Sequence, residues 1–203
     1  MNRTLFTIGH SSHSLSRFCE LLEQHHVTAV ADVRSQPYSR RNPQFNRDAL
    51  ECELDRRGIV YVFLGAELGA RPSDPDCYCD GKVQYDRLAR TVLFRAGIER
   101  VRKGMERYTL ALLCAEADPV QCHRTVLVCR HLKRAGLDIQ HILPTGAVES
   151  QNESEHRLLK LHNLSGVDLF SGSDDLLEKA YRLQESRIAY GRSNRGLDHG
   201  SAN

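Results

Sequence analysis

Five short apolar segments, separated by helix-forming stretches, constrain the fold of this chain more than any other feature. Each segment is apolar along its length instead of alternating with polar residues, which is typical of strands buried on both faces of a parallel sheet. The segments lie at residues 5–8, 27–33, 59–64, 110–113 and 139–143. The sequence therefore predicts an α/β fold, with a Rossmann-like open parallel sheet of about five strands, helices on both faces and a C-terminal helical extension.

Capping residues indicate where the intervening helices begin and end. Ser14 can accept a hydrogen bond at the start of one helix, and Asn46 can do so at the start of a second, with Gly58 just past its end. A long helical pattern over residues 85–105 is expected to be loosened at Gly97, because glycine is a poor helix former.

The length of 203 residues suits one domain. We expect a single α/β domain over residues 1–192, with a terminal helix over 176–189, and a polar, flexible tail over 193–203. The sequence shows no signal peptide and no apolar run near the ~18 residues of a membrane span. The chain has seven cysteines, an odd number, which favours free thiols. Together with the lack of a signal peptide and of a membrane span, this favours a cytoplasmic location without a membrane partner.

Polar residues follow the first four expected strands at the point where each strand ends. Because the carboxyl ends of parallel strands meet at one edge of a sheet, and open α/β sheets bind ligands at that edge, these residues are expected to share a crevice. They are His10 and Ser11 after the first strand, Asp32 and Arg34 at the second, Glu67 after the third, and Cys114 and Glu116 at the fourth.

The segment that follows the fourth strand contains the highest density of reactive and charged side chains. Asp118 can cap a helix there, with Pro119 at its first position. Two thiols, a carboxylate, an imidazole and a guanidinium therefore lie at a strand exit and a first helical turn, which indicates a reactive or anion-binding site. These groups belong to Cys114, Glu116, Cys122, His123 and Arg124.

Both thiols have a structural and a functional interpretation. Cys122 shares a helical face with Val126 and Cys129, as expected for a buried core thiol. Alternatively, its place in a first helical turn would lower its pKa and favour a thiolate, so that Cys122 or Cys114 acts as a nucleophile beside His123.

The loop after the second strand holds Arg34, Arg40, Arg41 and Arg47 with no acidic residue between them. Four guanidinium groups beside a site suit phosphate or carboxylate recognition, and a solvated loop is the alternative. Glu67 is either a site residue or the partner of Arg71.

The chain lacks the glycine-rich dinucleotide fingerprint, and the spacing of its Cys and His residues matches no common zinc pattern. A metal site formed by Cys77, Cys79, Cys114, Cys122 and His123 is an alternative, but the missing zinc pattern leads us to expect no metal. The sequence indicates no particular cofactor. The net charge of +2 does not by itself indicate a nucleic acid or membrane partner.

Taken together, these segments resemble the Domain of Unknown Function 488 family over roughly residues 4 to 190. The resemblance is carried by Thr7-Ile8-Gly9-His10-Ser11, Asp32-Val33-Arg34, Pro37-Tyr38-Ser39-Arg40, Glu67-Leu68-Gly69, Cys114-Ala115-Glu116, Cys122-His123-Arg124, Leu169-Phe170 and Ile188-Ala189-Tyr190. The chain departs from the pattern at Ala70, where a second glycine is expected. The resemblance implies an α/β fold with an unassigned activity.

Two classes of function are compatible with these residues. The first is an enzyme, a hydrolase or transferase acting on a phosphorylated or anionic ligand such as a nucleotide or nucleic acid, with Asp32 or Glu116 as base and His123 as acid. The second is a non-catalytic module that binds a nucleotide or nucleic acid. In both classes the ligand would contact His10, Ser11, Arg34, Arg40, Arg41, Glu67 and Arg124.

Overall fold

The computed structural model describes residues 4–164 and 173–191. The tail expected at 193–203, and the Leu169-Phe170 segment of the family resemblance, lie outside the described residues. Within the described ranges no helix is long and apolar enough to cross a membrane.

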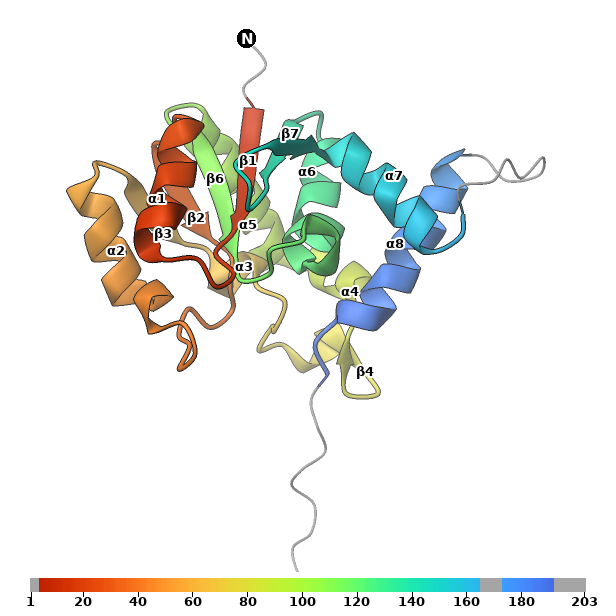
Figure 1. The fold of residues 1–203 in the computed structure, drawn as a ribbon. Coiled ribbons are helices and arrows are strands. Elements are labelled where there is room, and N and C mark those ends of the chain that lie inside the picture. Colours follow the sequence, from red (N-terminus) through yellow and green to blue (C-terminus); the bar gives the residue numbers. More distant parts are fainter. Residues whose placement is uncertain (1–3, 165–172, 192–203) are drawn as a thin grey trace, which may run out of the picture.

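A six-stranded, mostly parallel sheet forms the centre of the fold (Figure 1). The first five strands pair in parallel, and the last joins the edge antiparallel. The order across the sheet is β3-β2-β6-β1-β7-β8, so β6 lies between β2 and β1. The strands are β1 (Thr4–Gly9), β2 (Ala29–Asp32), β3 (Val60–Phe63), β6 (Leu110–Cys114), β7 (Asp138–Ile142) and β8 (Val148–Ser150).

Helices cover both faces of the sheet, which confirms the predicted α/β architecture (Figure 1). On one face, α1 (Leu15–Gln24) and α2 (Arg47–Arg56) pack their apolar side chains on the strands. The opposite face is covered by α5 (Val92–Met105), the π-helix η4 (Arg124–Cys129), α6 (Arg130–Arg134) and α7 (Gln151–Leu161). Outside this layer, α4 (Tyr85–Ala89) packs on α5, and α8 (Ser173–Ile188) packs on α7 and η4.

The helix starts agree with the capping signals in part. The Ser14 hydroxyl accepts the Arg17 N–H at the start of α1, as predicted. Asn46 precedes α2, but its side chain accepts the Ser39 N–H instead of capping the helix. Gly58 follows α2 with a positive φ of 70°, the conformation that favours glycine.

The expected loosening at Gly97 is wrong. The pattern over 85–105 breaks earlier, between α4 and α5, where the Thr91 hydroxyl caps α5 by accepting the Phe94 N–H. Gly97 stays helical because α5 packs tightly there: a Cβ on Gly97 would lie 2.8 Å from the Leu68 side chain. The glycine therefore serves close packing between helices.

Several elements have weak periodic signals and were not predicted. They are β8, α7, α3 (Gly65–Leu68), the β4–β5 hairpin (Tyr78–Cys79 and Lys82–Val83), and the 3-10 turns η1 (Pro43–Phe45) and η2 (Pro75–Cys77). The helix predicted from Pro119 is only the 3-10 turn η3 (Pro119–Gln121). Of these, α3 and η3 lie at strand exits and help to shape the candidate site.

Candidate functional site

A cavity of about 270 Å³ opens at the carboxyl edge of the sheet. Its walls combine the exits of β2 and β6 with residues from the middle and the C-terminal end of the chain. The polar and aromatic side chains that line it include Arg34, Tyr38, Arg71, Tyr85, Cys114, Glu116, Gln121, His123 and Tyr190.

The segment after β6 forms one wall and folds differently from the expected helix. The Asp118 carboxylate accepts the Val120 N–H, as its capping role predicts, but the turn η3 lasts only three residues. Cys122 then adopts an extended backbone before the π-helix η4 begins at Arg124. Cys122 is therefore not in the first turn of a regular helix.

The exit of β1 holds this segment in place. The His10 N–H donates to the Cys114 carbonyl at 3.0 Å, and the Ser11 N–H donates to the Ala115 carbonyl at 2.9 Å. A Cβ on Gly9 would lie 1.8 Å from the carbonyl oxygen of Glu116. Only glycine allows this approach, so Gly9 helps to fix where Glu116 lies.

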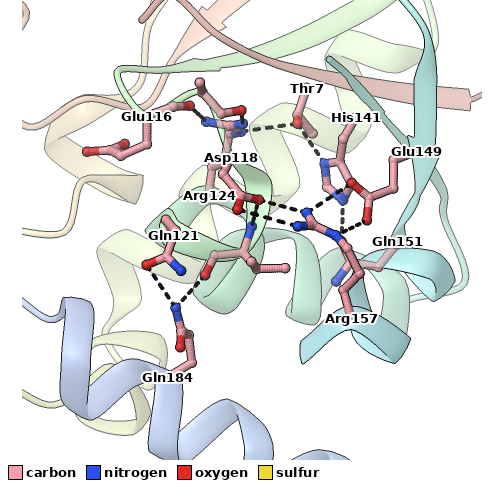
Figure 2. A network of polar contacts seen from close by, with 12 residues as sticks. Thr7, Glu116, Asp118, Gln121, Arg124, His141, Glu149, Gln151, Arg157 and Gln184 are labelled. Carbon is pink, nitrogen blue, oxygen red and sulfur yellow. Dashed lines mark hydrogen bonds and ion pairs between the residues drawn. The ribbon is translucent and has the colours of Figure 1, made fainter. Parts of the chain in front are cut away.

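Arg124 holds the same segment from inside the protein (Figure 2). Its side chain is 0 % exposed. Its guanidinium donates to the carbonyl oxygens of Glu116 at 2.6 Å and Ala117 at 3.4 Å, and to the Thr7 hydroxyl at 3.2 Å. Arg124 is thus a buried structural clamp and does not line the cavity.

Further contacts hold the outer side of the segment (Figure 2). Arg157 on α7 forms ion pairs with Asp118 and with Glu149, both at 2.7 Å. Gln184 on α8 donates to the Val120 carbonyl at 2.8 Å. The C-terminal helices therefore support the site.

Four side chains gather at the exit of β6. The Glu116 Oε2 atom accepts hydrogen bonds from the thiols of Cys114 at 3.1 Å and Cys122 at 3.0 Å. The Nδ1 atom of His123 lies 3.6 Å from the Cys114 sulfur and 3.9 Å from the Cys122 sulfur. The four potential ligand atoms lie within 4.8 Å of one another, so these residues could hold a metal ion.

Burial and hydrogen bonding set the protonation of this cluster. Burial raises the pKa of the Cys122 thiol well above its usual value, which favours the neutral thiol over the thiolate expected at a helix N-terminus. Burial also acts to raise the pKa of Glu116, but the hydrogen bonds from the two thiols outweigh it and lower that pKa. Without a metal, the cluster is a carboxylate bound by two thiols.

Asp32 and Arg34 are paired with each other beneath the cavity. The Asp32 carboxylate is fully buried and accepts from Arg34 at 2.5 Å and from the Tyr61 hydroxyl at 2.8 Å. Arg34 also donates to the Phe45 carbonyl at 3.0 Å. Arg34 lines the cavity, but most of its donors are occupied, and Asp32 has little capacity left to act as a base.

The other arginines of the loop do not converge on the cavity. Arg40 and Arg41 are exposed and lie outside its lining. Arg47 lies over the Phe63 ring, 5.3 Å from its centroid, and pairs with Glu51. The structure therefore brings only one of the four arginines to the site.

His10, Ser11 and Glu67 also lie outside the lining. The His10 ring stacks on Phe45 with centroids 4.4 Å apart, and burial lowers its pKa. Glu67 forms an ion pair with Arg100 and none with Arg71. His10 and Ser11 contribute to the site through the backbone hydrogen bonds described above.

Several polar and aromatic residues of the lining were not predicted as site residues, among them Tyr38, Arg71, Tyr85, Gln121 and Tyr190. The Arg71 guanidinium lies over the Tyr190 ring, 4.6 Å from its centroid, which joins the loop after α3 to the end of the chain. The Tyr85 hydroxyl is buried and has no hydrogen-bond partner in the described part of the chain. The segments that carry the family resemblance contain Tyr38 and Tyr190, and this was the available signal for these two residues.

The buried His141, behind the site, should make the stability of the protein sensitive to acid. Its ring contacts the Thr7 hydroxyl at 2.8 Å and Gln151 at 2.9 Å, and burial, reinforced by the Arg124 charge, lowers its pKa to about 3. The unfolded chain takes up the proton near the ordinary pKa of ~6.5, so this stability is present above that pH and is lost as pH falls toward 3. From pH 8 to pH 5 the loss should reach about 2 kcal/mol.

Denaturant unfolding of wild type and His141→Gln between pH 5 and 8 checks this expectation. Between pH 8 and pH 5, the free energy of unfolding should fall by about 2 kcal/mol less in the variant than in wild type, whatever the stability of the variant at pH 8. Equal slopes in the two proteins would contradict the assignment to His141.

A comparison with family models matches residues 14–130, more than half of the chain, to the model described as Domain of unknown function DUF488. The matched range contains the Asp32–Arg34 pair and the whole Cys114, Glu116, Cys122 and His123 cluster. Comparisons with curated proteins and with solved structures gave no significant match.

Proposed function

The chain belongs to the family described as Domain of unknown function DUF488, and we propose that it is an enzyme. The description of the family itself assigns no activity. The proposed substrate is a small anionic molecule such as a nucleotide, bound in the cavity at the carboxyl edge of the sheet. The reaction is a hydrolysis or a group transfer. The observation that carries the proposal is the placement of Glu116 on the cavity wall, fixed by two thiols and by its own clamped backbone.

Glu116 is the best-placed group for proton transfer. Its side chain is exposed to the cavity, whereas Asp32 is buried and saturated by hydrogen bonds. Its backbone cannot shift easily, because Gly9 and Arg124 contact its carbonyl from two sides. A base that is already positioned needs no reorganisation when it accepts a proton from an attacking water or hydroxyl group.

The cavity suits a ligand with both an anionic group and a planar ring. Arg71 supplies a cation at the wall, whereas the charge of Arg34 is balanced by Asp32. Tyr38 and Tyr190 supply aromatic surface on which a ring can stack.

Replacing Glu116 with glutamine tests the catalytic role. A panel of nucleotides and phosphate esters is first screened for binding and for product formation. For any substrate found, Glu116→Gln should lower kcat by about 10²–10⁴-fold, the usual contribution of general acid–base catalysis. Glu51→Gln, on an exposed ion pair of α2, is the matched control and should leave kcat unchanged.

Two outcomes contradict the proposal. A ligand that binds but is never consumed makes the chain a binding module instead of an enzyme. Turnover that survives in Glu116→Gln assigns proton transfer to another group.

A further inference from the structure

We propose that Cys114, Glu116, Cys122 and His123 bind one Zn²⁺ ion at the wall of the cavity. Two sulfurs, one imidazole nitrogen and one carboxylate oxygen form a donor set that Zn²⁺ prefers, while Mg²⁺ and Ca²⁺ prefer oxygen ligands. The inference deepens the proposed function and rests on the same site. It differs from the sequence expectation because spacing along the chain gave no zinc pattern, whereas the fold brings the four residues together.

The distances from His123 to the two sulfurs match those of a tetrahedral site. Bonds of about 2.3 Å to sulfur and 2.0–2.1 Å to nitrogen place neighbouring ligand atoms about 3.5–3.8 Å apart. The His123 Nδ1 atom lies 3.6 Å and 3.9 Å from the two sulfurs. The Glu116 oxygen is closer to the sulfurs, at 3.0 Å and 3.1 Å, because thiol protons bridge these atoms. The ion would replace those protons, which pass to solvent.

The orientation of His123 fits a metal ligand. Its Nε2 atom lies 3.1 Å from the Val33 carbonyl oxygen, which can only accept a hydrogen bond, so Nε2 carries the proton. The lone pair of Nδ1 in the neutral ring then points toward the two sulfurs. Metal-binding histidines commonly donate the second ring N–H to a backbone carbonyl in this way.

The surroundings of the sulfurs also fit a metal thiolate. The backbone N–H of Arg124 points at the Cys122 sulfur at 3.4 Å, a contact that stabilises negative charge on sulfur. Two thiolates and a carboxylate around Zn²⁺ leave one net negative charge. The buried Arg124 guanidinium, which has no carboxylate partner among the described residues, would offset that charge.

Access distinguishes this cluster from a closed structural site. Cys114, Glu116 and His123 line the cavity, so a ligand in the cavity reaches the ion directly. The carboxylate is the hard donor of the set and the one that a water or a substrate oxygen would displace. Zn²⁺ bound there would supply Lewis-acid chemistry to the proposed hydrolysis or transfer.

The test measures metal binding without relying on turnover. The starting protein carries Cys52→Ser and Cys79→Ser, which remove the exposed thiols and their adventitious metal binding. After chelation, it is titrated with Zn²⁺ and with Co²⁺. We expect one equivalent of each, with thiolate-to-cobalt charge-transfer bands and the intense visible bands of tetrahedral Co²⁺.

Variants of the cluster assign the ligands. Cys114→Ser and His123→Asn should each weaken Zn²⁺ binding by at least ~100-fold, the upper range for loss of an outer partner of a metal site. Cys129→Ser removes a buried thiol that is outside the cluster and should bind Zn²⁺ as the parent does. Circular dichroism identifies any variant that fails to fold. The folded variants of the cluster then decide whether these residues bind Zn²⁺.

Three results would overturn the proposal: no stoichiometric binding, cobalt spectra without thiolate bands, or unchanged affinity in folded Cys114→Ser and His123→Asn proteins. Formation of a Cys114–Cys122 disulfide in place of metal binding would do the same. Because the readouts are metal content and absorption, a protein that binds Zn²⁺ yet consumes no ligand contradicts only the proposed function.

Discussion

Arg124→Met is expected to lower the free energy of unfolding by about 3–5 kcal/mol, the cost of breaking a fully buried, hydrogen-bonded charge. The change leaves the carbonyl oxygens of Glu116 and Ala117 without the donor that Arg124 supplies, and methionine cannot replace those hydrogen bonds. Arg124→Lys should recover only part of the loss, because one ammonium group cannot reach all the acceptors of a guanidinium. Urea unfolding at pH 7.5 measures each difference.

Arg56→Met is the matched control for Arg124. The Arg56 side chain is 71 % exposed and pairs with Glu53 on the same helix. Its replacement should change stability by no more than ~0.5 kcal/mol. If Arg124→Met were as stable as this control, Arg124 would not be the clamp that the hydrogen bonds indicate.

Gly9→Ala is expected to destabilise the protein by about 3 kcal/mol or more, at or above the usual range for overpacking. The added Cβ would lie 1.8 Å from the Glu116 carbonyl oxygen and 2.6 Å from its carbon. These are backbone atoms held by Arg124, so no side-chain rotation relieves the clash. Chain displacement would also move the Glu116 carboxylate away from the two thiols.

Gly104→Ala is the opposite control. A Cβ at Gly104, in α5, would meet only the Leu110 side chain at an ordinary 3.5 Å. Alanine should therefore stabilise this helix by about 0.4–1 kcal/mol. Thermal and urea unfolding of both variants should show shifts of opposite sign, and a Gly9→Ala protein as stable as wild type would remove the steric argument.

The parts of the fold that follow from local pattern were predictable from the sequence. Short runs rich in apolar residues identified β1, β2, β3, β6 and β7, and Ser14 correctly marked the start of α1. The short strand β8 was missed because three residues carry no periodic signal. The break at Thr91 was missed because a capping threonine inside a helical pattern looks like an ordinary helix residue.

The site was predictable only as far as neighbours in the sequence define it. The segment from Cys114 to Arg124 was identified as the centre of the chemistry. Which of its groups face the cavity depends on long-range contacts, such as those of Arg124 with Thr7. Likewise, Tyr190 reaches the cavity through the packing of α8 against the rest of the domain, which no local pattern encodes.

The position of β6 in the sheet governs the order in which the chain can assemble as it leaves the ribosome. β2 and β3 can pair early, but β1 pairs with β6 and β7, the first of which begins at Leu110. Until that residue emerges, β1 has unpaired edges, and β2 lacks one neighbour. A nascent chain therefore exposes strand edges until β6 has emerged, a state that favours aggregation and chaperone binding. The strand that joins β2 to β1 ends at Cys114, so the cluster forms only once β6 has entered the sheet between them.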